Sequence, residues 1–197
     1  RLLGLSPAVN AGLNDVNDLE TDIRGEARIQ NDLIDMGAYE WTEGVDPYEI
    51  LVPIYVKADA SGTNDGSSWE NAFTSLQDAL DLATMGRVIW VAKGTYYPTS
   101  DYGLNIGDRG KHFRLKNGVA IYGGFSGNED PADFDLDDRD FSTNTSYLNG
   151  DIGVADDYSD NCYHVIYNPE ESALDTTAVL DGFTVWRGNA DGDDEHR

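Results

Sequence analysis

The sequence predicts an all-β scaffold in which short strands stack as coils and a single helix covers one end of the stack. Three observations support this fold class. One amphipathic stretch, residues 69–84, is followed only by short apolar runs that turns separate. Helical periodicity does not recur in the second half, which argues against a doubly wound sheet. The runs lack matching hairpin signals, so parallel coils or a sandwich of sheets are favoured.

The helix is predicted from an apolar stripe whose members recur at spacings of three and four residues. These members are Trp69, Ala72, Phe73, Leu76, Ala79, Leu80 and Ala83. We expect Asn71 or Thr74 to cap its first turn and Gly86 to end it in a left-handed conformation. Such a helix would cover the first coil and prevent end-to-end association.

Short apolar segments before and after the helix are predicted to be strands. They are Tyr55–Val56, Val88–Val91, Phe113–Leu115, Val119–Tyr122, Tyr147–Leu148, Tyr163–Tyr167 and Ala178–Val185. Glycines such as Gly94, Gly124 and Gly182 fall at or near strand ends, where a positive φ suits a sharp corner. The long acidic loop 128–146 is expected to project from the coil.

Composition divides the chain into three segments. Residues 1–41 are rich in Asn, Asp and Gly. Residues 42–54 carry Gly44, Pro47 and Pro53 among acidic positions, which is typical of a short extended linker. Residues 55–197 hold the predicted helix and strands. Because the chain opens and stops without a closing element, we expect it to be a piece of a longer protein.

The charge balance excludes some classes of function. The 197 residues carry 37 acidic and 13 basic side chains, for a formal net charge of −24. Such a chain repels phosphate backbones, so no nucleic-acid partner is expected. No run approaches the ~18 consecutive apolar residues of a membrane span. Cys162 is the single cysteine, so no internal disulfide can form, and we expect it to be a buried core side chain.

Several motifs resemble those of a known architecture. Residues 6–12, 21–28 and 35–40 resemble the closing segment of bacterial right-handed parallel β-helix repeat proteins, of the pectate-lyase-like superfamily. Residues 64–69 and 91–98 are similar to the opening segment of the same family. Further similar stretches are 115–125, 148–153 and 180–190.

The resemblance implies a right-handed parallel β-helix, a solenoid with one N-terminal capping α-helix. It also implies a junction: residues 1–41 would close a preceding module, 42–54 would link, and 55–197 would form the cap and first coils of the next. Relatives of this kind are large proteins that are secreted or displayed on the bacterial cell surface. The expected function is therefore that of a non-catalytic structural or adhesive module, with neighbouring modules and an extracellular polysaccharide or cell-surface glycan as partners.

The alternative is that the chain is part of a polysaccharide lyase or glycoside hydrolase with this fold. The family's catalytic residues lie on neighbouring middle coils, whereas this chain supplies ends. Glycoside hydrolysis also needs two carboxylates placed across a sugar, and the many carboxylates here form no recognisable pair. No catalytic residue is predicted.

Calcium is the one metal for which the sequence offers ligands. Hard cations take oxygens from Asp, Asn and backbone carbonyls in glycine-containing turns. The candidate ligands, in three acidic turns, are Asp15, Asn17, Asp22, Asn64, Asp65, Asp191 and Asp193. None of these turns has the twelve-residue calcium-loop pattern, and solvated acidic turns are the alternative. His112, His164 and His196 lack the spacing of a zinc site, so structural or solvated roles are expected.

Four tyrosines near predicted loops are candidates for stacking on sugar rings. They are Tyr96, Tyr97, Tyr102 and Tyr158. Packing in the core or on a sheet explains aromatic side chains equally well, so both interpretations stay open.

Overall fold

The computed structural model describes residues 20–21, 52–105 and 107–192. The chain divides into two compact units, residues 1–51 and 52–197. The fold described below is that of the second unit. The predicted closing segment and most of the predicted linker lie outside the described residues, apart from 20–21 and 52–54.

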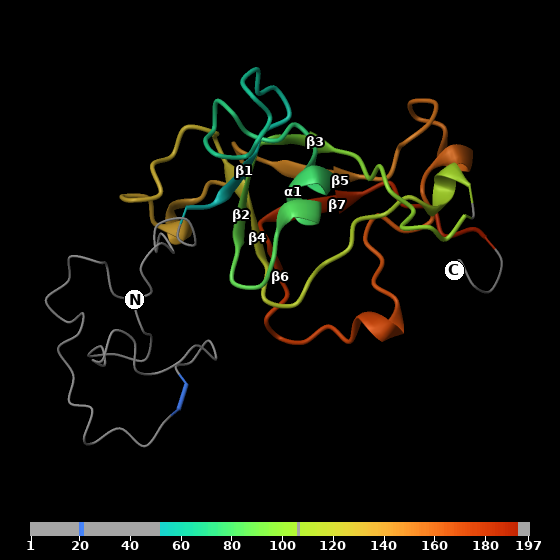
Figure 1. Cartoon of the computed structure of the whole chain (residues 1–197). Helices are drawn as coiled ribbons and strands as arrows, with labels where there is room; N and C mark the ends of the chain where they lie inside the picture. Colours follow the sequence, from blue (N-terminus) through green and yellow to red (C-terminus); the bar gives the residue numbers. More distant parts are fainter. Residues whose placement is uncertain (1–19, 22–51, 106, 193–197) are drawn as a thin grey trace, which may run out of the picture. The chain divides into compact units, whose positions relative to one another are not determined.

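The second unit consists mostly of short strands in two parallel sheets, with one α-helix among its described residues (Figure 1). The first sheet has the order β1-β2-β4-β6, formed by β1 (Ile54–Val56), β2 (Val88–Ala92), β4 (Ala120–Phe125) and β6 (Val179–Asp181). The second has the order β3-β5-β7, formed by β3 (Gly94–Tyr96), β5 (Ser146–Asn149) and β7 (Phe183–Trp186). The helix is α1 (Leu76–Leu82). The parallel strands and the single helix confirm this part of the predicted fold.

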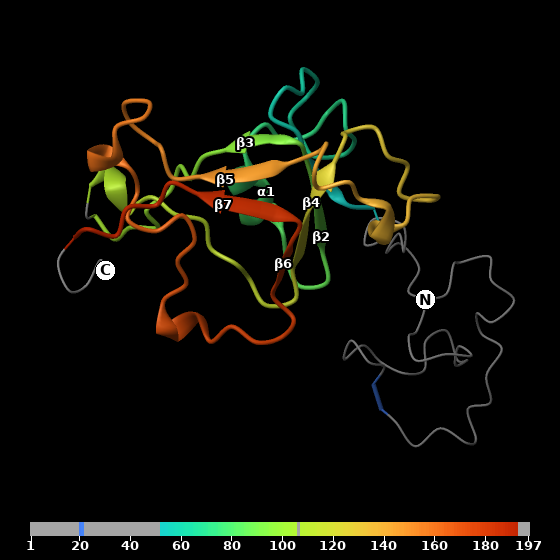
Figure 2. The ribbon, with the colours of Figure 1, turned by 180° about the vertical axis from the view of Figure 1, so that it is seen from behind.

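From β2 onward, consecutive strands belong alternately to the two sheets, as the two opposite views in Figures 1 and 2 show. An isolated parallel bridge joins Phe113, which follows β3, to Ile166, which follows β5. The chain therefore visits the first sheet, the second sheet and this bridge in the same order twice. In each sheet and at the bridge, the later segment pairs with the earlier one, and every pairing is parallel.

One face of the first sheet supplies a row of aliphatic side chains to the main core. In register across the sheet, the row is Ile54, Ile89, Ile121 and Leu180. Ile89 and Ile121 are fully buried, and Tyr96 and Leu148 of the second sheet belong to the same cluster. Burying one such side chain contributes roughly 1.5–3 kcal/mol, so this row is a main source of stability.

The opposite face of the first sheet is aromatic. The adjacent register row is Tyr55, Trp90, Tyr122 and Asp181. Trp90 stacks on Phe125 with ring centroids 4.5 Å apart, and Trp69 and Phe134 complete the cluster. Offset or tilted aromatic pairs at such distances add about 0.5–1.5 kcal/mol beyond area burial.

Loop 128–146 extends from the sheets as predicted (Figures 1 and 2), but it is also anchored to them. Phe134 and Leu136 of this loop pack against the aromatic cluster. Arg139 holds the loop: its Nε donates to the Leu136 carbonyl at 2.7 Å, and it pairs with Asp181 at 2.6 Å. The loop is anchored because Phe134 and Leu136 cover aromatic rings, while its aspartates remain exposed.

The predicted helix 69–84 is shorter in the structure, and its predicted caps are wrong. Ser75 is the N-cap, accepting a hydrogen bond from Gln77 N at 3.1 Å, and α1 ends at Leu82. Phe73 instead forms a parallel bridge with Val56 of β1. The first half of the predicted apolar stripe thus packs against the first sheet instead of forming a helix, although its spacing is helical. Trp69 and Ala72 belong to the aromatic cluster, and Phe73 pairs with β1.

At the C-terminal end of α1, a lysine side chain bonds the last carbonyl groups, and no glycine cap is present there. Lys116 Nζ donates to the carbonyls of Leu80, Asp81 and Ala83, which have no partner within the helix. Gly86 has the predicted positive φ, 85°, but it lies in the turn beyond the helix. Its N–H donates to the Gly118 carbonyl at 2.7 Å.

Two predicted strands are wrong and one is divided. Phe113–Leu115 and Tyr163–Tyr167 contribute only the isolated bridge. The Asn168 side chain takes the place of a strand partner, because it accepts from Leu115 N at 3.1 Å and donates to Leu115 O at 2.9 Å. Ala178–Val185 splits into β6 and β7 at Gly182, whose φ of 81° turns the chain from one sheet to the other.

Among the described residues, no helix has the length and apolarity needed to cross a membrane.

Candidate functional site

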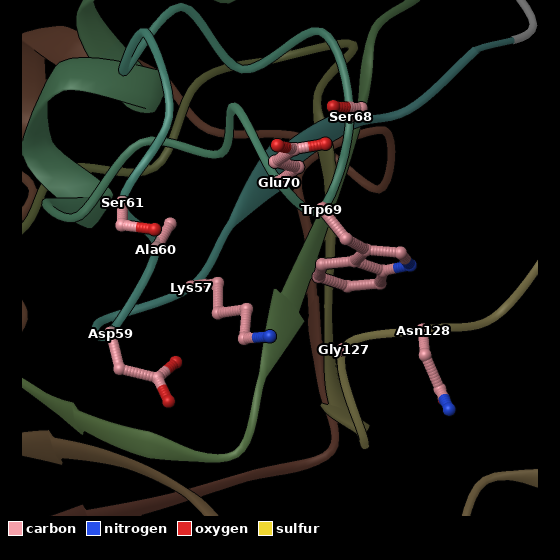
Figure 3. A pocket seen from close by; sticks show the side chains of 9 residues that line it. All are labelled: Lys57, Asp59, Ala60, Ser61, Ser68, Trp69, Glu70, Gly127 and Asn128. Carbon is pink, nitrogen blue, oxygen red and sulfur yellow. The ribbon is translucent and has the colours of Figure 1, made fainter.

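A pocket of about 580 Å³ opens between the segment that follows β1 and the turn that follows β4. Its lining residues are Lys57, Asp59, Ala60, Ser61, Ser68, Trp69, Glu70, Gly127 and Asn128. Figure 3 shows the side chains of Lys57 and Asp59 extending into the space that the Trp69 indole borders. The volume lies within the ~300–1,000 Å³ typical of sites for small ligands.

Trp69 is held at the rim by its neighbours. Its Nε1 donates to the Glu129 carbonyl at 2.9 Å, and its ring meets Tyr55 edge-on at 4.7 Å. The indole remains partly exposed. A fixed aromatic ring with one open side is a ready surface for stacking, because binding costs it little conformational freedom.

Lys57 brings a positive charge into the pocket. An ideal Cβ placed on Gly127 would lie 3.2 Å from Lys57 Cδ, so the lysine stem passes close to the backbone of this turn. Gly127 also has a φ of 94°, which disfavours any other residue there. The ion pairs formed among the described residues do not include Lys57. Its ammonium can therefore engage a ligand without breaking one of these pairs.

The turn that supplies Gly127 and Asn128 to the pocket lining is held by the carboxylate of Glu129. Glu129 accepts hydrogen bonds from the backbone N–H groups of Ser126, Gly127 and Asn128. Burial raises the pKa of Glu129, but these bonds and that from the Ser126 hydroxyl outweigh it and lower the pKa overall. The turn is therefore pre-organised, and its N–H groups are not available to an anionic ligand.

The pocket combines one aromatic face, one ammonium, two exposed carboxylates and two hydroxyls. Sugars present apolar C–H faces for stacking and hydroxyls that both donate and accept hydrogen bonds, so this set suits a saccharide. The pocket lining contains no histidine or cysteine, but carboxylates and lysines such as those present here occur in catalytic sites as well as in binding sites.

A second, smaller cleft of about 420 Å³ lies beyond β3 and β5. It is lined by Tyr97, Pro98, Thr99, Lys111, Asp151, Ile152, Gly153 and Ala155. The Tyr97 ring is exposed, and Lys111 pairs with Asp108 at 2.8 Å.

The candidate calcium ligands fall partly outside the described residues: Asp15, Asn17, Asp22 and Asp193 do. Asn64 Oδ1 accepts from Thr74 N at 2.8 Å. Asp65 accepts from the Thr63 hydroxyl at 2.6 Å and from Ser67 N at 2.9 Å. Hydrogen bonding by the Ser67 side chain is the largest cause that lowers the pKa of Asp65, followed by the bonds from the Thr63 hydroxyl and Ser67 N. Both residues thus use their oxygens to shape the turn.

Asp191, the remaining described candidate, is paired with Arg109 at 2.5 Å. This contact is the main reason that the pKa of Asp191 is lowered. The structure does not bring it together with Asn64 or Asp65 in a common site. Among the described residues, no group of three His, Cys, Asp or Glu side chains is placed to hold a metal ion.

The four candidate tyrosines divide by exposure. Tyr96 is buried, so its prediction as a sugar platform is wrong: its hydroxyl donates to the Ala92 carbonyl at 2.8 Å, and burial raises its pKa. Tyr102 is half-buried under the Arg114 guanidinium, 4.2 Å away. Tyr97 and Tyr158 are exposed. Only Tyr97 lines one of the two clefts.

The described histidines and the cysteine have structural surroundings. His112 is buried, with Nδ1 2.7 Å from the Gly110 carbonyl and Nε2 accepting from Arg114 Nε at 3.0 Å. Burial is the main cause that lowers its pKa, and this hydrogen-bond pattern assigns the neutral ring. His164 stacks on Tyr167. Cys162 is buried as predicted, and burial raises the pKa of its thiol to about 12.

No pattern in the sequence marks Lys57 or Asp59 as a pocket residue. Trp69 was assigned to the apolar face of the helix, whereas it borders the pocket. The pocket joins residues 57–70 to residues 127–128, and no sequence pattern connects segments so far apart. The only available signal was an aromatic residue within a glycine- and serine-rich stretch.

Comparisons with protein-family models, with curated proteins and with solved structures found no significant match.

Proposed function

We propose that residues 52–197 form the opening end of a right-handed parallel β-helix in a large bacterial protein that is secreted or displayed on the cell surface. Its role is structural and adhesive, and the pocket around Trp69 binds a glycan. The observation that carries this proposal is the repeated order of first sheet, second sheet and bridge, with every pairing parallel. Stacked coils of a solenoid produce this order.

The position of α1 supports the role of a cap. Its buried residues Leu76, Ala79 and Leu80 belong to the same cluster as Ile54 and Val56 of β1, the edge strand of the first sheet. A terminal coil needs such a cover, because its apolar interior would otherwise face water. At the other edge, β6 and β7 end the two sheets, and Val185 of β7 is 52% exposed. A further coil would bury it.

The adhesive role rests on the pocket. A fixed, partly exposed indole beside an ammonium, two carboxylates and two hydroxyls fits a sugar ring, and two carboxylates against one ammonium favour a saccharide without a carboxylate of its own. The pocket lies against the outer face of the first strands, so a ligand can bind without entering the core.

The test is binding of the full chain to an array of neutral and uronate-containing oligosaccharides. Lys57→Met keeps the apolar stem and removes the charged hydrogen-bond donor, and we expect at least about a tenfold loss of affinity for the saccharide that the wild type binds. Lys93→Met changes the net charge equally at an exposed position outside the pocket and serves as the control. Equal losses in both variants, or no binding by the wild type, would overturn the glycan site.

The same samples distinguish an adhesin from a lyase or hydrolase. Binding with unchanged oligosaccharide supports the non-catalytic role. Release of unsaturated or reducing sugar ends by the purified chain would contradict it and favour the enzymatic alternative.

A further inference from the structure

The loop between β5 and the buried Cys162 is closed at its base. Cys162 N donates to the Gly150 carbonyl at 2.9 Å. An ideal Cβ on Gly150 would lie 2.8 Å from Cys162 Sγ, so the two chain segments are in close contact there. Asp151 follows Gly150 and Asn161 precedes Cys162, so both lie next to this contact, one on each side of the loop.

This loop contains an unusual concentration of buried oxygens without a hydrogen-bond donor. In the described part of the chain, five buried side-chain polar atoms have no partner: Gln77 Oε1, Trp90 Nε1, Asp151 Oδ1, Asp160 Oδ1 and Asn161 Oδ1. Three of the five belong to this one loop, and all three are oxygens. Buried acceptors of this kind are rare in proteins, and a bound ion or water is one of the recognised reasons for them.

Each carboxylate uses one oxygen for the loop and leaves the other without a donor. Asp151 Oδ2 pairs with Arg187 and accepts from Asp156 N at 3.0 Å. Asp160 Oδ2 accepts from Val154 N at 2.7 Å. The Asp151 side chain is only 6% exposed, yet it lines the smaller cleft with Ile152 and Gly153. An ion therefore has a route from solvent to this carboxylate.

Nearby cationic side chains do not satisfy these oxygens. Arg187 pairs with Asp151 Oδ2 and with Asp156. Arg109 donates to the Asn161 backbone carbonyl at 2.8 Å and pairs with Asp191, so it does not contact the Asn161 side-chain oxygen. Among the described residues, Asp160 has no ion-pair partner.

We propose that loop 150–162 binds one calcium ion through Asp151 Oδ1, Asp160 Oδ1 and Asn161 Oδ1. Calcium takes six to eight oxygens in a flexible geometry, so backbone carbonyls and water complete the shell. A donor set of oxygen alone, with no imidazole or thiolate, excludes a preference for zinc or copper. The set has two carboxylates and one amide oxygen. It therefore agrees with the finding that no three His, Cys, Asp or Glu side chains of the described residues are grouped around a metal position.

The ion stabilises the end of the second sheet. The loop leaves β5 at Asn149, and Arg187, which binds Asp151 and Asp156, directly follows β7. Calcium binding therefore fixes the segments that extend from two neighbouring strands. This site lies apart from the Trp69 pocket and does not depend on the glycan proposal.

The test is thermal unfolding of the full chain after chelator treatment, with calcium or magnesium added back, together with calorimetric titration of calcium. We expect calcium to raise the unfolding midpoint and magnesium to do so less. Asp160→Asn keeps the shape and removes the charge. It should weaken calcium binding by at least about tenfold, the loss that even changes outside the first ligand shell commonly cause.

Asp157→Asn is the matched control, because this exposed carboxylate of the same loop bonds only to Ser159. Its calcium affinity should stay within about twofold of the wild type. An identical midpoint with calcium and with chelator would overturn the proposal and assign the three oxygens to water. Equal losses of affinity in the two variants would also overturn it.

Discussion

At the scale of single residues, arginines hold the loops of this acidic protein. The Arg139 side chain is 6% exposed and joins the carbonyls of Leu136 and Gly123 to Asp181. Arg109 and Arg187 each connect segments far apart in the sequence in the same way. The planar guanidinium, with five donors, suits this task better than lysine, because one side chain can satisfy several acceptors at once.

Glycines at two positions allow a test of the close packing between β4 and the corner that follows β6. Gly182 and Gly103 have the same φ of 81°, but a Cβ on Gly182 would lie 2.6 Å from the Gly123 carbonyl oxygen, whereas Gly103 has no atom within 4 Å. Gly103→Ala should cost about 1–2 kcal/mol from backbone strain alone. Gly182→Ala should cost about 1–3 kcal/mol more, measured by urea unfolding. Equal costs would show that Gly182 is needed only for its φ.

At the scale of elements, α1 is a short helix stabilised by its surroundings. Seven residues are too few for an independent helix. Ser75 caps its start, and Lys116 binds its last carbonyls from another segment. Its buried side face joins the main core cluster. The helix and β1 therefore belong to one cooperative unit.

Substitutions at two leucines of α1 distinguish its role in covering the core from its formation as a helix. Leu80 is 1% exposed and Leu82 is 56% exposed. Leu80→Asp places an unpaired charge in the core and should cost on the order of 4 kcal/mol. It should also promote self-association, which light scattering detects.

Leu82→Asp carries the same chemical change on the solvent side of the helix and should stay within about 0.5 kcal/mol of the wild type. If Leu80→Asp unfolds at the same denaturant concentration as this control and remains monomeric, α1 does not cover the core.

At the scale of the whole molecule, charge governs the response to pH. The net charge of −24 means that the folded state carries considerable self-repulsion at neutral pH. Several carboxylates nevertheless have a lowered pKa, and the largest cause is a hydrogen bond that a neighbouring hydroxyl donates to the carboxylate. Ser142 lowers the pKa of Asp140 to about 2, and Ser159 and Thr177 act in the same way on Asp157 and Asp175.

These lowered pKa values predict the direction of acid unfolding. A carboxyl whose pKa is lower in the folded state stabilises the fold above its unfolded pKa of about 3.9, and this stabilisation is lost as pH falls toward the folded value. The thermal midpoint should therefore fall more steeply between pH 4 and pH 2 than between pH 7 and pH 5. Relief of repulsion acts in the opposite sense. Calorimetry showing a midpoint that rises steadily to pH 2 would contradict the expectation.

Much of this architecture could be predicted where local pattern and final packing agree. The apolar run at Val88–Val91 is β2, and Ala79, Leu80 and Ala83 line the core beside it. The prediction failed where a tertiary partner decided the outcome. Phe73 has helical spacing but joins β1, and an Asn168 side chain replaces a strand at Leu115. The pocket could not be predicted, since Lys57 and Asn128 meet only through the fold.

The two register rows of the first sheet differ in whether a further strand beside β6 would continue the same kind of contact. Ile54, Ile89, Ile121 and Leu180 repeat one kind of contact, while the aromatic row Tyr55, Trp90, Tyr122 ends in Asp181, which Arg139 neutralises. For the glycan binding that we propose, the consequence is one of valency. In the proposed β-helix, a column of any length carries the Trp69 pocket once, at this end. Multivalent attachment must then come from repeating whole modules rather than from adding coils.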